Sequence, residues 1–257
     1  MCRWLSYRGP AIFLEDLLYT PKHSLIDQSL QAHEAKTPTN GDGFGVGWFG
    51  ERNIPGTYHE ILPAWNDGNL RSLARQIKSP NFFAHVRAST GTATSRANCH
   101  PFSHGRWMFM HNGQVGDYHR LRRAMENRIP DETYHCRKGT TDSEAIFFML
   151  LSNGLDDDPV TATRETINEI RGLMGDYDIK LPFRMTAAFT DGSRYYAVRY
   201  STDDRPPSLY YCDEKGGLTV MSEPVTEESQ TWKEVPPDSI LISEGDGRPT
   251  LAGLDIN

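Results

Sequence analysis

The second residue of the chain is a cysteine, and its position gives it chemistry that an internal cysteine lacks. Methionine aminopeptidase removes Met1 when the next residue is small, which would leave Cys2 with a free α-amine beside its thiol. The reference pKa of an α-amine is about 7.7–8.0, against about 10.4 for lysine, so this amine can accept a proton near neutral pH. One residue would then supply both a nucleophile and its base, as in enzymes with an N-terminal threonine. The alternative is a cysteine that follows the start methionine by chance.

Asn112 and Gly113 follow the apolar run 107–110 and could stabilise a negative charge. The side-chain N–H of an asparagine and the backbone N–H of a following glycine can point at one spot, as an oxyanion hole requires. Asn-Gly is also the commonest pair in hairpin turns. The sequence leaves both interpretations open.

Two charged residues could bind the ends of an amino acid. Arg87 comes at the end of a predicted strand, 81–88, where a single arginine that faces a pocket can clamp a carboxylate. Asp142 lies in the first turn of a predicted helix, 141–152. The alternatives are a surface charge at a strand end for Arg87 and a favourable interaction with the helix dipole for Asp142.

Other motifs carry less chemistry. Residues 45–50 match G-x-G-x-x-G, but the residues that follow, Glu51 to Gly56, cannot start the helix that a dinucleotide-binding fingerprint requires. Glycines there indicate close backbone approach instead. The four cysteines include no C-x-x-C, and Cys99-His100 and His135-Cys136 are adjacent pairs with poor ligand spacing. The sequence therefore gives no reason to expect a metal or an organic cofactor.

Composition excludes several classes of protein. The chain has 257 residues, with 27 Lys plus Arg against 34 Asp plus Glu and a formal net charge of -7. That balance argues against a general nucleic-acid binder. The longest apolar run, 145–151, is far shorter than the roughly 20 residues of a membrane span. No apolar signal segment follows Met1, so we expect a cytoplasmic protein with reduced thiols.

The predicted elements are a group of strands, a block of helices and a second group of strands, which favours an α+β fold in a single domain, 1–257. We expect 22–42 to be a long loop and 223–238 a surface excursion. Helices are predicted at 13–19, 67–78, 114–127, 141–152 and 160–174. Strands are predicted at 1–8, 58–62, 81–88, 107–111, 184–190, 194–200, 208–212, 218–222 and 239–243.

Six blocks, taken together, resemble the glutaminase domain of class II glutamine amidotransferases, which belong to the N-terminal nucleophile hydrolase superfamily. The small stand-alone YafJ-like members are the most similar. The resemblance lies in the order and spacing of the blocks and spans nearly the whole chain. They are Met1-Cys2, Asn40 to Gly45, His85 to Thr90, Asn98 to Phe102, His111-Asn112-Gly113 and Thr141 to Glu144.

The resemblance implies a fold and roles. The fold would be a four-layer αββα sandwich of two antiparallel sheets. Cys2 would attack the side-chain amide of glutamine, with Asn112 and the backbone N–H of Gly113 stabilising the oxyanion. The substrate would bind through Arg87 at its α-carboxylate, Asp142 at its α-ammonium and Thr90 along the pocket wall.

The same resemblance leaves three functions open. The first is a glutamine amidotransferase that makes ammonia for a separate synthase subunit, because almost no sequence remains for a synthase domain. The second is a stand-alone amidohydrolase that acts on a γ-glutamyl compound, and the third is a catalytically silent regulatory subunit. Ala88 and Gly91 stand where familiar members of the broader family have Trp and His, which weakens the assignment of Thr90.

Overall fold

The computed structural model describes residues 2–33, 39–89, 93–214, 216–225, 232–245 and 247–256. Within these residues the strands form two sheets in which all paired neighbours run antiparallel. The first sheet runs in the order β11 (Lys233–Glu234), β9 (Tyr210–Glu214), β10 (Gly217–Met221), β1 (Arg3–Phe13), β4 (Lys78–Val86), β2 (Phe44–Trp48) and β3 (Gly56–Glu60). The second runs in the order β13 (Thr250–Gly253), β12 (Ser239–Ser243), β8 (Tyr195–Ser201), β7 (Arg184–Thr190), β6 (Trp107–Gln114) and β5 (Phe102–His104).

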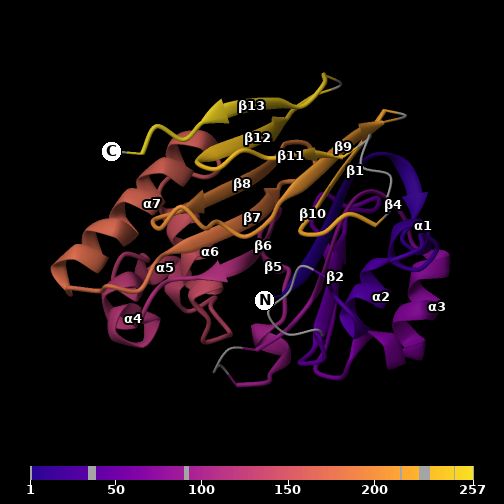
Figure 1. Ribbon diagram of the computed structural model, residues 1–257, viewed down its shortest axis with the longest axis horizontal. Helices are drawn as coiled ribbons and strands as arrows, with labels where there is room; N and C mark the ends of the chain where they lie inside the picture. Colours follow the sequence, from indigo (N-terminus) through magenta and orange to yellow (C-terminus); the bar gives the residue numbers. More distant parts are fainter. Residues whose placement is uncertain are drawn as a thin grey trace.

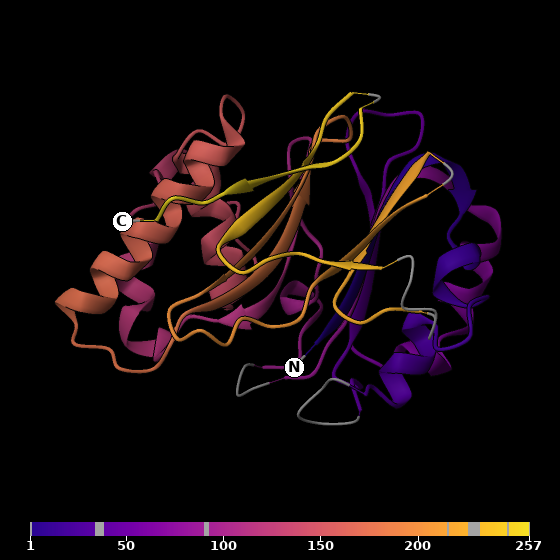
Figure 2. The same ribbon diagram turned by 45° about the horizontal axis from the view of Figure 1, so that its top comes forward.

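Helices cover the outer face of each sheet, so that the molecule has four layers (Figures 1 and 2). The first sheet carries α1 (Glu15–Leu18), α2 (Leu25–Leu30) and α3 (Gly68–Gln76). On the side of the second sheet lie α4 (Tyr118–Glu126), α5 (Asp131–Tyr134), α6 (Asp142–Ser152) and α7 (Pro159–Asp176). This is the four-layer αββα sandwich of two antiparallel sheets that the family resemblance implies. None of the helices in the described ranges is long and apolar enough to cross a membrane.

Side chains alternate between the two faces of each strand, and this alternation directs the site. On β1, Trp4 packs between the sheets with Met108 and Met110 of β6, whereas Leu5 packs beneath the helices. Since Cys2 lies two residues before Trp4, the alternation places it on the side that faces the second sheet.

Several predicted elements agree closely with the structure. The strand predicted at 184–190 is β7, and the one at 239–243 is β12. Helix α3 begins after Asp67, whose carboxylate accepts a hydrogen bond from Leu70 N as an N-cap. Helix α7 has Pro159 at its first position.

Three predictions were wrong. The loop predicted at 22–42 contains α2, whose capping box joins Ser24 and Asp27. The predicted helix 114–127 begins only at Tyr118, because β6 continues to Gln114 and pairs with β7. The predicted excursion 223–238 is partly core: Glu223, Val225 and Val235 are buried. Its residues 226–231 lie outside the described ranges.

Candidate active site

A pocket of about 370 Å³ lies where the ends of three strands meet the start of α6. Cys2 before β1, Arg87 after β4, Gly113 on β6 and Asp142 in the first turn of α6 all line it. Four residues predicted from the sequence as far apart as positions 2 and 142 therefore share one cavity. Thr90, which was also predicted to line the substrate pocket, lies outside the described ranges.

The Cys2 thiol is held by the backbone of Ala88. Its Sγ accepts a hydrogen bond from Ala88 N at 3.4 Å and lies 3.6 Å from Ala88 O. Arg3 pairs with Val86 across β1 and β4, and this register brings Cys2 beside Arg87 and Ala88. Burial raises the pKa of the Cys2 thiol, an effect that the Ala88 hydrogen bond and the positive charges of Arg87 and Arg3 only partly offset. The thiol therefore stays protonated at neutral pH and needs a base.

Arg87 is a buried cation at the pocket wall, with 4% of its surface exposed. Its guanidinium donates to the backbone carbonyl of Asp42 at 3.3 Å, to Ser89 Oγ at 3.3 Å and to the backbone carbonyl of Ala93 at 3.4 Å. These three acceptors are neutral oxygens, and they hold the guanidinium in place. The alternative of a surface charge at a strand end is wrong.

Asn112 and Gly113 belong to β6 and do not form a hairpin turn. The register with β7 runs through both residues, with Asn112 opposite Thr186 and Gly113 opposite Met185. Gly113 has φ of 154°, and a Cβ there would lie 1.9 Å from the carbonyl oxygen of Arg184. Only glycine fits at this position.

The Asn112 side chain reaches Cys2. Its Nδ2 donates a hydrogen bond to the backbone carbonyl of Cys2 at 3.0 Å. An asparagine amide nitrogen carries two hydrogens, so this bond leaves one hydrogen for another acceptor. The contact brings the predicted pair of Cys2 and Asn112 together.

Asp142 is fixed by backbone donors at the start of α6. One carboxylate oxygen accepts from Val115 N and the other from Ser143 N, both at 2.8 Å. Thr141 caps the helix by accepting from Glu144 N. Thr141 and Glu144 have the spacing of a capping box, but its second half does not form, since the Glu144 carboxylate instead accepts from Lys138 N and Gly139 N.

Asn98 ties two walls of the pocket together, a role that sequence reasoning missed. Its amide donates to the carbonyl of Ala93 on the Arg87 side at 2.9 Å. Its Oδ1 accepts from Thr140 N at 2.8 Å, two residues before Asp142. The signal was present, because Asn98 falls in one of the blocks that carry the family resemblance.

Buried histidines surround the pocket. His100 and His111 line it, and the ring of His85 lies 4.3 Å from that of His100. His111 Nδ1 is 2.9 Å from Ser143 Oγ, which links β6 to α6. Burial lowers the pKa of all three, with that of His85 falling to about 3, helped by the positive charge of Arg87. These imidazoles are neutral at physiological pH.

The glycine-rich stretch at 45–50 serves the same region. Gly45 lies on β2, and a Cβ there would come 2.1 Å from the carbonyl oxygen of His100. Close backbone approach, as predicted, explains this glycine. No nucleotide-binding turn is formed, because residues 44–48 are a strand that pairs with β3.

Sequence comparison identifies the family. Residues 21–202 match the family described as glutamine amidotransferases class-II. The chain is 34% identical to a Saccharomyces cerevisiae protein named probable glutamine amidotransferase DUG3, over 94% of this chain and 81% of that protein. It is 27% identical to the gamma-glutamyl-hercynylcysteine sulfoxide hydrolase of Mycolicibacterium smegmatis, over 99% of this chain and 100% of that protein.

The solved structures agree. The glutamine aminotransferase class-II domain protein of Silicibacter pomeroyi superposes with a TM-score of 0.79 and 38% identity, covering 98% of this chain and 99% of that one. The shared fold and the sequence match over most of the chain together show that this chain belongs to the class II glutamine amidotransferases.

Proposed function

We propose that the chain hydrolyses the γ-amide bond of a glutamyl group through a thioester on Cys2, with L-glutamine as the simplest substrate. One observation carries the proposal: Cys2, Arg87, Gly113 and Asp142 line a single pocket. Their thiol, guanidinium, backbone N–H and carboxylate match the four needs of the reaction, which are attack on the amide carbon, two charged groups that bind the substrate and a donor that stabilises the oxyanion.

The nucleophile needs an internal base. Because burial raises the pKa of the Cys2 thiol, little thiolate is present at neutral pH. After removal of Met1, the α-amine of Cys2 would take the thiol proton as Sγ attacks the amide carbon. The new oxyanion would accept hydrogen bonds from Gly113 N–H and from the second amide hydrogen of Asn112.

The tetrahedral intermediate then collapses towards the leaving group. The α-ammonium of Cys2 returns the proton to the amide nitrogen, and the C–N bond breaks. Ammonia is released, and the glutamyl group remains on Cys2 as a thioester. A water molecule attacks the thioester, gives up its proton to the same amine and restores the thiol. The products are glutamate and ammonia.

Charge complementarity places the substrate. A glutamyl group carries an α-carboxylate and an α-ammonium on one carbon. The guanidinium of Arg87 would bind the carboxylate, and the carboxylate of Asp142 would bind the ammonium. Both protein groups are held by hydrogen bonds before the substrate arrives, which limits the entropy lost on binding.

A second candidate is hydrolysis of a larger γ-glutamyl amide, with an amine other than ammonia as leaving group. The lining of the pocket runs past Gly113 to exposed Gln114, exposed His119 and Leu181, which is 50% exposed. This open rim leaves room for a substituent larger than ammonia. The similarity over 99% of this chain to the gamma-glutamyl-hercynylcysteine sulfoxide hydrolase of Mycolicibacterium smegmatis supports the same candidate.

The two candidates differ in the fate of nitrogen. In an amidotransferase, ammonia would pass to an acceptor on a separate synthase subunit. An amidohydrolase needs no such partner. Steady-state assays with glutamine and with γ-glutamyl-alanine separate them, since the amidohydrolase should have the higher kcat/KM for the larger substrate.

The nucleophile itself is tested with a glutamine-like diazoketone, followed by intact mass and peptide mapping. We expect one adduct, on an N-terminal Cys2, and none in Cys2→Ser, which should also lose nearly all glutamate release. Cys99→Ser is the matched control, because Cys99 is buried outside the pocket and its thiol pKa is raised to about 11 by burial. A processed chain that forms no adduct and releases no glutamate would overturn the proposal and favour a silent regulatory subunit.

A further inference from the structure

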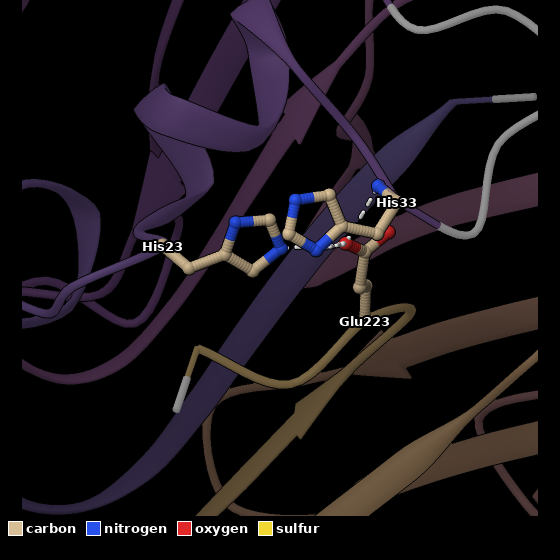
Figure 3. A group of neighbouring side chains, drawn as sticks. All are labelled: His23, His33 and Glu223. Atoms are coloured by element: carbon tan, nitrogen blue, oxygen red, sulfur yellow. Dashed lines mark hydrogen bonds and ion pairs between the residues drawn. The ribbon is translucent and has the colours of Figure 1, made fainter. Parts of the chain in front are cut away.

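Two histidines and a glutamate from three distant segments converge outside the active site (Figure 3). His23 lies before α2, His33 follows α2 and Glu223 follows β10. One ligand atom from each lies within 4.8 Å of the other two. None of the three lines the active-site pocket.

We propose that His23, His33 and Glu223 form a binding site for a borderline divalent metal ion, with zinc as the best fit. Two imidazole nitrogens and one carboxylate oxygen are a donor set that zinc favours, whereas magnesium and calcium prefer oxygen donors alone. Three protein ligands leave a fourth position for water. The three residues lie far apart in the sequence, where no local ligand spacing marks them, so this group was not predicted.

The carboxylate is already oriented towards the imidazoles. Glu223 is 3% exposed, and its Oε2 lies 3.1 Å from Arg3 Nε. Its Oε1 accepts from His33 N at 2.9 Å and lies 2.5 Å from His23 Nε2. Arg3 thus occupies the far oxygen and leaves Oε1 facing the histidines, as an outer partner of a metal ligand does.

The backbone around the site is strained and clamped. His23 has φ of 62°, a left-handed conformation that is strained for a residue other than glycine. The buried Gln28 amide donates to both His23 O and Glu223 O at 3.1 Å. One side chain therefore holds together the two segments that carry His23 and Glu223.

His33 would complete the site by a small rotation. Its ring now stacks on that of His23, with centroids 4.2 Å apart and 15° between the planes, and its Nδ1 is 4.0 Å from Glu223 Oε1. Two stacked rings cannot both point their nitrogens at one ion. The His33 side chain is 63% exposed and so is free to turn.

Metal binding would fix the tautomer of His23. Its neutral imidazole would carry the hydrogen on Nδ1, so that the lone pairs of Nε2 and of Glu223 Oε1 both face the cation. The charge of Arg3 opposes a dication, so the affinity should be below that of a closed four-ligand zinc site. The bound ion would join the α2 region to the segment after β10.

Zinc binding is measured by equilibrium dialysis against zinc chloride, with Cys2→Ala as the background because a Cys2 thiol beside its α-amine can itself bind zinc. We expect the background to bind one zinc per chain. The double variant Cys2→Ala/His33→Ala should bind zinc at least tenfold more weakly, because losing even a residue that only hydrogen-bonds a metal ligand lowers metal affinity by about 10–100-fold. Zinc at a hundredfold excess over its Kd should raise the Tm of the background by roughly 5–10 °C. Magnesium should have no effect.

His135→Ala in the same background is the control, since His135 is exposed and its ring bonds only a backbone carbonyl among the described residues. Cobalt(II) distinguishes the ligands, because coordination by the remaining thiols gives intense near-ultraviolet absorption and this site does not. Less than one zinc per chain, a thiolate band, or equal affinity with and without His33 would each overturn the proposal. The cluster would then be a hydrogen-bonded hub around Glu223.

Discussion

The Asn112 side-chain amide and the backbone carbonyl of Cys2 are joined by a hydrogen bond of 3.0 Å. Asn112 lies on β6 of the second sheet, and Cys2 comes directly before β1 of the first. The bond therefore joins the two sheets at Cys2, the proposed nucleophile. It uses the carbonyl of Cys2 and not its amine, so processing of Met1 leaves it intact.

Asn112→Ala should lower kcat for glutamate release by about 10²–10³-fold, because it removes an oxyanion donor and frees the backbone of Cys2. KM should change little, since Arg87 and Asp142, the charged residues proposed to bind the substrate, are unchanged. Steady-state kinetics on glutamine checks both values. Asn112→Asp is the matched comparison: it keeps the shape but loses the donors, so it should be as slow as the alanine variant. A change in kcat below threefold would contradict the oxyanion role.

Four of the predicted site residues converge on one pocket, whereas several predicted elements differ from the structure. Cys2, Arg87, Gly113 and Asp142 could be found because their order and spacing resemble a family, and each also suits its proposed chemistry. Their convergence follows from the pairing of β1 with β4 and of β6 with β7, which no local pattern encodes. Pairing of this kind also explains why α4 begins later than predicted, because residues up to Gln114 pair with β7 as part of β6.

Long-range burial explains the other failures. Glu223 looks like a surface residue in a polar stretch, yet Arg3 on β1 makes it a buried ion partner. The hydrogen bond of Asn112 to Cys2 was equally invisible, because the sequence indicates a donor but not its acceptor. Helix α2 could have been found, since Ser24 and Asp27 have the spacing of a capping box.

Arg87→Lys should raise KM for glutamine about 10–100-fold, because a lysine loses the fork that binds a carboxylate through two hydrogen bonds. The measurement is KM for glutamine and for 4-aminobutanamide, which lacks the α-carboxylate. For 4-aminobutanamide, the variant and the parent should have similar KM values. Arg75→Lys, on the exposed side of α3, is the control and should match the parent. An unchanged KM for glutamine would rule out the carboxylate role.

Asp142→Asn should weaken binding of glutamine through loss of the α-ammonium partner, by about 10-fold or more. The asparagine oxygen can still accept from Val115 N or Ser143 N, so the start of α6 should keep its geometry. With 4-carbamoylbutanoate, which lacks the α-amine, parent and variant should have similar KM values. If both substrates suffer equally, Asp142 acts on the fold of the pocket and not on the ammonium.

The buried histidines predict how stability depends on pH. His85, His100 and His111 have pKa values lowered by burial, to about 3 for His85, whereas an unfolded histidine titrates near 6.5. Between these values the unfolded chain binds protons that the folded chain does not. The contribution of these histidines to the free energy of unfolding should therefore be fully present above pH 6.5. It should decrease as the pH drops towards 3, by up to about 1.4 kcal/mol per pH unit for each histidine.

Urea unfolding at several pH values between 6.5 and 5 measures this slope. His85→Gln keeps a polar side chain but cannot take up a proton, so its slope should be smaller than that of the parent by about one proton's worth. The slope is the readout, and it holds whatever the variant does to stability at pH 7. His135→Gln, exposed on the surface, should keep the parent's slope. An unchanged slope in His85→Gln would mean that this imidazole takes up its proton in the folded chain and is less shielded from water than its burial indicates.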